Sequence, residues 1–361
     1  MAGLSFDPVG GQQLQASGVE HARPVGQPIT VADVTGSLFA AYTVEGGQVH
    51  LAGCQLTDHP FVRLTFAGET NEPQHHVHVA PDGSSVSDEL VPRLGLDALE
   101  PIEKLPPRLD DAALRSLVAA GRRMAAKQFS PREPDAPLPE PTAVTVAWIR
   151  HAEGRLQFDI GASTASVGFS AWAKLLTPPP FFASGSGASA FHLAATDDGR
   201  IDAAEEIAAC EHSGRRVLRQ ELLQCSVTGK HVLPDFTEAC PVSGRPALRT
   251  EFVSCTVCKQ HVSKAVMEAG ACGACRSLAK ATKDDPRLVW IFGEHPGLDH
   301  WKHWRLAETQ SVYIAEATSL LKRLLVVVDK ESLAVHRLAV ANRLSSTWIA
   351  ASDAERADLL K

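Results

Sequence analysis

The sequence lacks any long apolar segment. Its most apolar run, Leu324 to Val328, is far shorter than the roughly 20 residues needed to cross a bilayer. The first fifteen residues contain no basic stretch followed by an apolar core, which is the pattern of a secretory signal. We therefore expect no membrane association and no export, and the expected compartment is the cytoplasm.

The sequence also lacks an excess of positive charge and a regular alternation of strands and helices. The formal net charge is −7, which argues against a protein that coats nucleic acid with its whole surface. Without repeated β–α–β units there is no basis for a parallel sheet. The predicted fold class is α+β and strand-rich, with tandem zinc-ribbon-like β-hairpin repeats flanked by mixed α+β segments.

Signatures of common enzymes are weak or absent. The glycine-containing run Ser184–Gly187 lacks the Lys-Ser/Thr of a phosphate loop, and no Ser-His-Asp arrangement is evident. The segment Val144–Glu153 resembles the histidine phosphatase signature, which implies His151 as phosphoryl acceptor and Arg150 as phosphate clamp. We interpret Ala-Glu-Gly-Arg at 152–155 instead as a hairpin turn before a new strand, so the sequence favours a non-enzyme.

Local patterns predict the elements that flank the centre of the chain. Residues 110–127 have helical periodicity, with acidic residues in the first turn and basic ones in the last. Strands are expected at 38–44, 48–52, 61–66, 143–149, 155–160, 166–169, 312–315 and 322–340, the last broken at 329–331. Further helices are expected at 299–308 and 348–360.

These elements suggest five segments. A proline-rich stretch cannot form a helix or a central strand, and we place a linker and a domain boundary there. The expected segments are a β-rich N-terminal domain ending in a helix (1–130), the linker (131–141), a β-rich segment (142–207), a repeat block (208–282) and a C-terminal α+β segment (283–361).

Cysteine, by contrast, is present in a regular pattern. Eight cysteines without an export signal indicate metal ligands or buried thiols rather than disulfides. Cys210, Cys225, Cys240 and Cys255 are each fifteen residues apart, and the units share Cys, two residues, Ser, Thr or Cys, and in most units Gly and a basic residue. A fixed period of this kind indicates a repeated structural unit. The segment 181–193, with Ser186-Gly187, is a candidate for a more degenerate first unit.

The shared pattern resembles a zinc knuckle, a tight Cys-x-x-Cys-Gly turn in which glycine permits a positive φ angle. In the units that begin at Cys225 and Cys240, Thr228 and Ser243 replace the second cysteine while the glycine remains. A hydroxyl can hydrogen-bond the local backbone and hold such a turn without metal. We therefore predict knuckles that keep the turn and lack the ion, joined by short hairpins.

The last unit differs because it carries four cysteines. Cys255-x2-Cys258, thirteen residues and Cys272-x2-Cys275 have the spacing of a zinc ribbon. Four soft ligands favour Zn²⁺ over Mg²⁺ or Ca²⁺, with a small iron site as the alternative. Four thiolates leave no open position for water, so the predicted zinc is structural.

The block from about Trp148 to Leu278 resembles uncharacterised bacterial proteins that carry tandem Cys-x2-Ser/Thr-Gly-Lys/Arg repeats ending in a four-cysteine zinc ribbon. The matching residues are 225–230, 240–245 and the four final cysteines. The resemblance covers about a third of the chain and implies no catalytic residue.

Two further groups of side chains deserve comparison with metal sites. Cys210, Cys225 and Cys240 can form a second site only if His212 or His231 joins them; otherwise they are small core residues. In the N-terminal part, Cys54 and His59 accompany a histidine cluster. Its members are His75, His76 and His78. Such histidines are more often solvated than ligating, so we expect no metal there.

The repeat block differs from the rest of the chain in charge. From Cys210 to Lys283 there are eleven Lys and Arg and six acidic residues, a net charge of +5. Arg215, Lys230, Arg245 and Lys259 follow successive knuckles and can form a row that contacts phosphates or an acidic partner. The alternative is that they protect strand edges from aggregation. Few aromatic residues interleave with them, which argues against base stacking.

Together these features predict a non-enzymatic zinc-binding scaffold or adaptor. Its ribbon repeats would bind a protein partner, or nucleic acid, through the surface that carries the basic residues. The alternative is a metal-dependent or phosphate-processing enzyme that uses His151 or the N-terminal histidine cluster. Trp301 and Trp304 have helical spacing that serves core packing or the docking of a partner.

Overall fold

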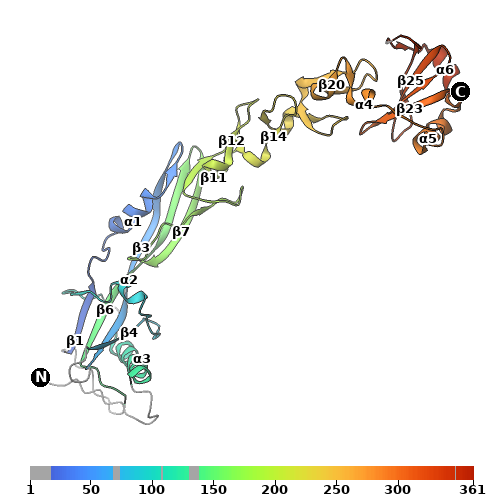
Figure 1. Cartoon of the computed structure of the whole chain (residues 1–361). Coiled ribbons are helices and arrows are strands. Elements are labelled where there is room, and N and C mark those ends of the chain that lie inside the picture. Colours follow the sequence, from blue (N-terminus) through green and yellow to red (C-terminus); the bar gives the residue numbers. More distant parts are fainter. Residues whose placement is uncertain (1–17, 68–73, 107–108, 130–137, 346) are drawn as a thin grey trace. The chain divides into compact units, whose positions relative to one another are not determined.

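The computed structural model describes residues 18–67, 74–106, 109–129, 138–345 and 347–361, and the chain divides into two compact units, Met1–Glu205 and Glu206–Lys361. Both units combine strands with fewer helices, so the strand-rich α+β fold class is confirmed at that level. Within the described residues no helix is long and apolar enough to span a membrane. Each unit is described by itself (Figure 1).

The first unit is built on two long antiparallel strands, β3 (Gly47–Phe66) and β6 (Ala143–Ile160), which pair along almost their whole length. The sheet order is β4-β3-β6-β1-β5, and β7 pairs with β6 near its C-terminal half. Strand β1 runs parallel to β6, and the other pairs are antiparallel. The remaining strands are β1 (Val19–Pro24), β4 (His75–Val79), β5 (Leu99–Pro101) and β7 (Ser163–Trp172).

The long strands contribute to three hydrophobic cores, one of which contains Phe61, Ala147 and Ile149. Val144 and Val146 of β6 pack with helix α3 (Asp111–Phe129), whereas Leu156 and Phe158 pack with helix α1 (Val31–Ala40). A register irregularity in β3 at Gly53, which has a φ of +128° and lies beside Gly154, falls within the core that contains α1. A bulge of this kind bends the strand and increases its twist.

Short elements complete the first unit. Strand β2 (Thr43–Val44) pairs with β10 (His192–Ala195), which pairs with β11 (Ile201–Ala203). A small hairpin, β8 (Phe181–Phe182) and β9 (Ser189–Ala190), turns at Ser186-Gly187 in the segment considered as a degenerate first unit. The other helices are α2 (Leu90–Leu94) and the 3₁₀ turn η2 (Ala204–Glu206).

The predicted helix at 110–127 is confirmed as α3, and the predicted stretches 48–52, 61–66, 143–149 and 155–160 are in strands, but the start of the strand at 38–44 and the breaks between strands are wrong. Residues 38–40 end helix α1, which begins with a capping box between Thr30 and Asp33. The stretches 48–52 and 61–66 belong to one strand, as do 143–149 and 155–160. Glu153 and Gly154 pair with β3 on one side and β7 on the other, so sheet pairing overrides the turn tendency of this sequence.

The expected domain boundary at 131–141 also differs from the structure. Residues 131–137 lie outside the described ranges, but β6 follows them and pairs with β1 and β3, which precede them. The segments 1–130 and 142–207 therefore contribute to one sheet. Long-range pairing of this kind cannot be inferred from the local composition of a linker.

The second unit begins with five hairpins, here called the hairpin series (207–272). Each consists of two short antiparallel strands, and four of the hairpins turn at one of the periodic cysteines. The pairs are β12 (Ile207–Ala209) with β13 (Arg216–Leu218), β14 (Leu223–Gln224) with β15 (His231–Val232), β16 (Thr237–Ala239) with β17 (Pro246–Leu248), β18 (Phe252–Ser254) with β19 (His261–Ser263), and β20 (Met267–Glu268) with β21 (Ala271–Cys272).

A 3₁₀ turn joins each hairpin of the series to the next. These turns are η3 (Arg219–Glu221), η4 (Pro234–Phe236), η5 (Arg249–Glu251) and η6 (Lys264–Val266), and they begin at intervals of fifteen residues. The sequence had suggested that the two strands between successive cysteines pair with each other. They do not. They pair instead across the cysteine turns.

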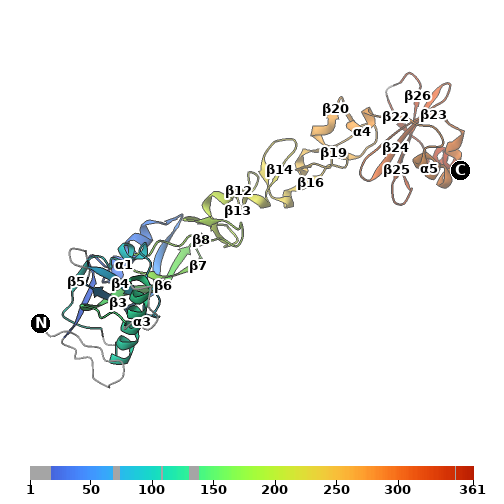
Figure 2. The same cartoon turned by 60° about the horizontal axis from the view of Figure 1, so that its bottom comes forward.

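The unit ends in an antiparallel sheet with strands in sequential order, β22 to β27 (Figure 2). Helix α5, η7 and α6 provide residues to the core on one face, and the hairpin series and α4 pack on the other. The bounds are α4 (Gly273–Arg276), β22 (Ala279–Lys280), α5 (Pro286–Glu294), η7 (Pro296–His300), β23 (Lys302–Glu308), β24 (Val312–Thr318), β25 (Lys322–Asp329), β26 (Val335–Asn342), β27 (Ile349–Ala350) and α6 (Asp353–Leu360).

Two helix predictions in this region need correction. The stretch 299–308 is mainly strand β23, and Trp304 is buried in the sheet core rather than on a helix. Trp301, its partner in the predicted helical spacing, lies between the end of η7 at His300 and the start of β23 at Lys302. The stretch 348–360 contains a short edge strand before α6, which starts at the Ser352 cap.

Candidate metal centre

The cysteine turns of the hairpin series repeat one backbone geometry. In the first three, the glycine four residues after the cysteine donates its N–H to the cysteine carbonyl at 2.7 to 2.9 Å. The cysteine N–H donates to the carbonyl of the basic residue that follows this glycine. The glycines have φ angles between +72° and +77°, which other residues adopt at a cost. They are Gly214, Gly229 and Gly244.

A hydroxyl occupies the position of the second ligand in these three turns. The Ser213, Thr228 and Ser243 hydroxyls each accept a hydrogen bond, at 3.4 Å, from the N–H two residues on. The same hydroxyls bond to the cysteine sulfurs. Side chains and backbone therefore satisfy these turns without an ion.

The thiols of the first three turns also connect one hairpin to the next. The N–H of Leu233 donates to Cys210 Sγ and that of Leu248 to Cys225 Sγ, both at 3.4 Å. Burial alone would raise the pKa of these thiols. The hydrogen bonds from the neighbouring hydroxyl and N–H groups outweigh it and lower the pKa of Cys210 and of Cys225 to about 7. That of Cys240 is lowered in the same way. The sulfurs of these cysteines are buried in the core and accept hydrogen bonds there.

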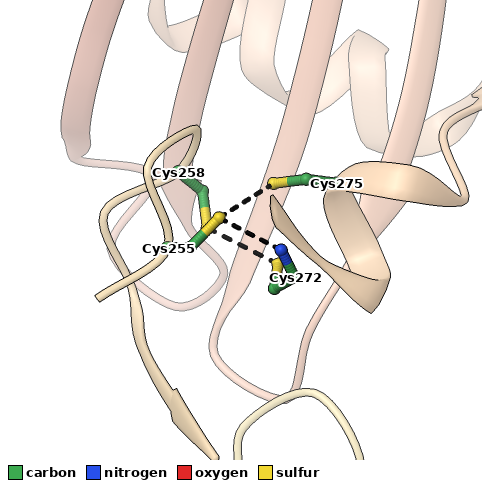
Figure 3. Close-up of side chains that lie close together, drawn as sticks. All are labelled: Cys255, Cys258, Cys272 and Cys275. Atoms are coloured by element: carbon green, nitrogen blue, oxygen red, sulfur yellow. Dashed lines mark hydrogen bonds between the residues drawn. The ribbon is translucent and has the colours of Figure 1, made fainter. Parts of the chain in front are cut away.

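The fourth turn brings four cysteines together. Cys255 and Cys258 come from the turn between β18 and β19, Cys272 ends β21, and Cys275 lies in α4 (Figure 3). Their sulfurs all lie within 4.8 Å of one another, with Cys255–Cys275 and Cys258–Cys272 separations of 3.8 Å. Three of the four are buried and Cys275 is partly exposed. This group can bind a metal ion.

The electrostatics of the group favour a cation. Contacts with the other three thiols strongly lower the pKa of Cys255, while contacts with the neighbouring sulfurs raise the pKa of Cys258 and of Cys275. Four thiols so close together cannot all ionise unless a positive charge lies between them, because the resulting thiolates repel one another. The Cys272 N–H also donates to Cys255 Sγ at 3.3 Å, which orients that sulfur.

No second converging group is found in the described part of the chain. Among those residues, the four cysteines form the one set of three or more His, Cys, Asp or Glu side chains whose ligand atoms meet. His212 instead packs against Phe236, with ring centroids 4.7 Å apart. Neither His212 nor His231 belongs to such a set with the thiols of the hairpin series.

The N-terminal histidines lie on strand β4. His76 and His78 have ring centroids 6.4 Å apart, and burial lowers the pKa of His78 to about 4. Strand β4 pairs with residues 62–66 of β3, whereas Cys54 lies opposite Gly154 and His59 opposite Ile149, outside that paired segment. The strand pairing therefore separates residues that their spacing in the sequence had grouped together.

The phosphatase-like residues face a different environment from the one their motif implies. Arg150 makes two hydrogen bonds of 2.7 Å to the Asp58 carboxylate and another to the Ile29 carbonyl. His151 lies against Trp172, with ring centroids 5.1 Å apart. Because its guanidinium is already paired, Arg150 is not arranged to clamp a phosphate.

The structure changes the predicted basic row. Arg215, Lys230 and Arg245 are exposed and occupy equivalent positions after the glycine of each turn. Lys259, also exposed, occupies the glycine position itself with a φ of +61°, and Gln260 takes the position of the basic residue. The row therefore has three equivalent members, and Lys259 is not one of them, because it occupies the glycine position of its turn.

Comparisons with known proteins give no further assignment. No family model matches the chain, and neither a curated protein nor a solved structure matches it significantly.

The sequence reasoning missed how the metal centre is covered. Ala307, Ile314 and Val327 of the C-terminal sheet belong to the same buried cluster as the four cysteines. A signal for this was present, because 312–315 and 324–328 are apolar on successive positions rather than alternating ones. Such runs indicate strands with both faces covered.

Proposed function

We propose that this protein is a non-enzymatic scaffold or adaptor whose hairpin series is held by a structural zinc ion. The observation that carries the proposal is the closed set of four cysteine sulfurs, buried against the C-terminal sheet. Four protein ligands leave no position for a substrate or an activated water, which catalytic zinc sites require. The centre therefore supports folding rather than chemistry.

The identity of the metal follows from the ligands. Four thiolates in a compact arrangement are typical of structural Zn²⁺, and a single iron ion is the alternative. Elemental analysis of the purified chain is expected to give one zinc per chain. A zinc content well below one, or an unchanged stability of Cys258→Ser, would contradict this assignment.

We further propose that the hairpins are units of one degenerate zinc-ribbon-like repeat, related to the bacterial proteins with tandem Cys-x2-Ser/Thr-Gly-Lys/Arg repeats. The recurring hydrogen bonds and the fifteen-residue spacing support this view. Only the last unit would retain a full ligand set. Eight free cysteines fit a reducing compartment, and we propose the cytoplasm.

The partner would bind the hairpin series through exposed basic side chains. Arg215, Lys230 and Arg245 form no ion pair with any described residue, and they recur at the same place in three successive turns. We favour an acidic protein partner, since aromatic side chains for base stacking are few; nucleic acid is the second candidate. Protection of strand edges remains the simplest competing role.

A salt-dependent binding assay separates these roles. The chain would be tested against DNA, RNA and an acidic polypeptide such as polyglutamate at low and high salt. Binding that is lost when Arg215, Arg245 and Lys230 are changed to Glu supports the basic surface. If the wild-type chain binds none of these probes even at low salt, the basic surface is not a binding site.

The enzyme alternative makes a separate prediction. A phosphate-processing activity that depends on His151 would be abolished by His151→Ala. We expect no such activity, because Asp58 and the Ile29 carbonyl already occupy Arg150. Hydrolysis of a generic phosphomonoester by the purified chain, lost in His151→Ala, would overturn the non-enzymatic assignment.

A further inference from the structure

A cavity of about 430 Å³ lies beside the metal centre, within the second unit. Three parts of the chain meet there: the turn that follows Cys258, the sheet strands β25 and β26, and the start of helix α6. The wall also includes Ala350 and Ala351 from the edge of the sheet. Because these parts are distant in the sequence, the cavity exists only in the folded unit.

The residues that line this cavity are cationic or neutral. Lys259, His336, Arg337 and Arg356 contribute to it, and no carboxylate does. Arg356 donates to the Val335 carbonyl, and His336 lies 3.5 Å from an Asp329 oxygen. Lys259 and Arg337 form no ion pair with any described residue. Several positive groups around one cavity create a field that attracts an anion.

Arg337 provides the most specific observation. It lies on β26 opposite Val327, and its Nε is buried without a hydrogen-bond partner among the described residues. A buried donor that lacks a partner costs about 1 to 3 kcal/mol, and more when the group is charged. Such a group in a cavity wall indicates a ligand that supplies the missing acceptor.

The backbone of Lys259 provides a second, independent observation. The equivalent positions in the three preceding turns are all glycine, with φ near +75°, whereas Lys259 adopts a φ of +61°. A side chain in this conformation costs roughly 1 to 2 kcal/mol. Strain of this kind is found preferentially at functional sites, and here it occurs at Lys259, which lines the cavity.

We propose that this cavity binds the phosphoryl group of a small phosphomonoester. A planar guanidinium offers two parallel donors that match a phosphate, and an ammonium adds a point charge. The volume exceeds that of a phosphate ion alone and leaves room for a small attached group. Bound there, the ligand would join the cysteine turn, the sheet and α6. The site does not depend on the partner proposed for the hairpin series.

The test uses the full-length, metal-loaded chain with inorganic phosphate and glycerol phosphate as probes, and acetate as the comparison anion at equal ionic strength. Calorimetry should detect binding of both phosphates, and the Arg337 Nε–H resonance should move on addition. Arg337→Gln and Lys259→Gly are each expected to weaken binding at least about tenfold, which corresponds to one charge-assisted hydrogen bond.

Two variants keep the test interpretable. Lys259→Gly removes the charge and also relieves the backbone, so it should fold at least as well as the wild type while it loses affinity. Arg249→Gln removes one exposed charge from the turn η5, outside the cavity, and should bind within about twofold of the wild type. Absence of binding at about 10 mM phosphate, equal affinity for acetate, or unchanged affinity in Lys259→Gly would each overturn the proposal.

Discussion

At the scale of single residues, the positions after the periodic cysteines decide what each turn does. A glycine with positive φ and a hydroxyl two positions before the basic residue close a turn without metal, as at Thr228-Gly229. A second cysteine and a lysine at the same two positions give the turn that contributes to the metal centre. One turn geometry therefore accepts two chemistries.

This view predicts the effect of filling a glycine. At Gly229 a Cβ would meet nothing within 4 Å, so Gly229→Ala should destabilise the second unit only through its φ of +74°, by about 1 to 2 kcal/mol. Gly293→Ala in helix α5, which also has free space but a helical backbone, should be neutral or stabilising. Denaturant unfolding of both variants measures the difference, and equal effects would contradict the role assigned to Gly229.

At the scale of elements, the hairpins depend on their neighbours. Each is too short to be stable alone, since a two-stranded hairpin is marginal in water. The bond from Leu248 N–H to Cys225 Sγ, and the shared buried cluster that includes Val232 and Ala247, link successive hairpins. Stability in such an arrangement is approximately a sum over units and over their interfaces.

A deletion tests this additivity. Removal of residues 225–239 joins Gln224 to Cys240 and preserves the fifteen-residue phase, so the shortened chain should fold and keep its metal, with a lower free energy of unfolding. Removal of 225–232 deletes the turn and strand β15, and so leaves the preceding strand β14 without its partner. That control should lose cooperative unfolding and metal. Similar behaviour of the two deletions would show that the fifteen-residue spacing of the hairpins does not matter for folding.

At the scale of the whole molecule, the chain has two compact units with separate cores. The four cysteines belong to the second unit only, in a cluster that includes Ile314 and Val327 of its sheet. A metal bound there stabilises the folded state of that unit, because the unfolded chain does not present the four sulfurs together.

Metal removal should therefore act on one unit. Calorimetry of the metal-loaded chain is expected to resolve two transitions, and a strong chelator should lower the midpoint of the second unit by about 10 °C or more. The transition of the first unit should not move. Cys275→Ser should reproduce the effect without chelator. A single transition that shifts as a whole would mean that the units do not unfold independently.

The sequence alone predicted the group of four cysteines, the period of fifteen residues and helix α3, because spacing and helical periodicity are local properties. It failed where pairing is long-range: 143–160 is one strand because β3 and β7 flank it, although Glu-Gly-Arg reads locally as a turn. It also placed Lys259 among the basic row, and only the hydrogen bonds of the turn assign it to the glycine position. The cavity around Arg337 depended entirely on the tertiary structure, since its wall joins residues 258–260 to residues between 327 and 356.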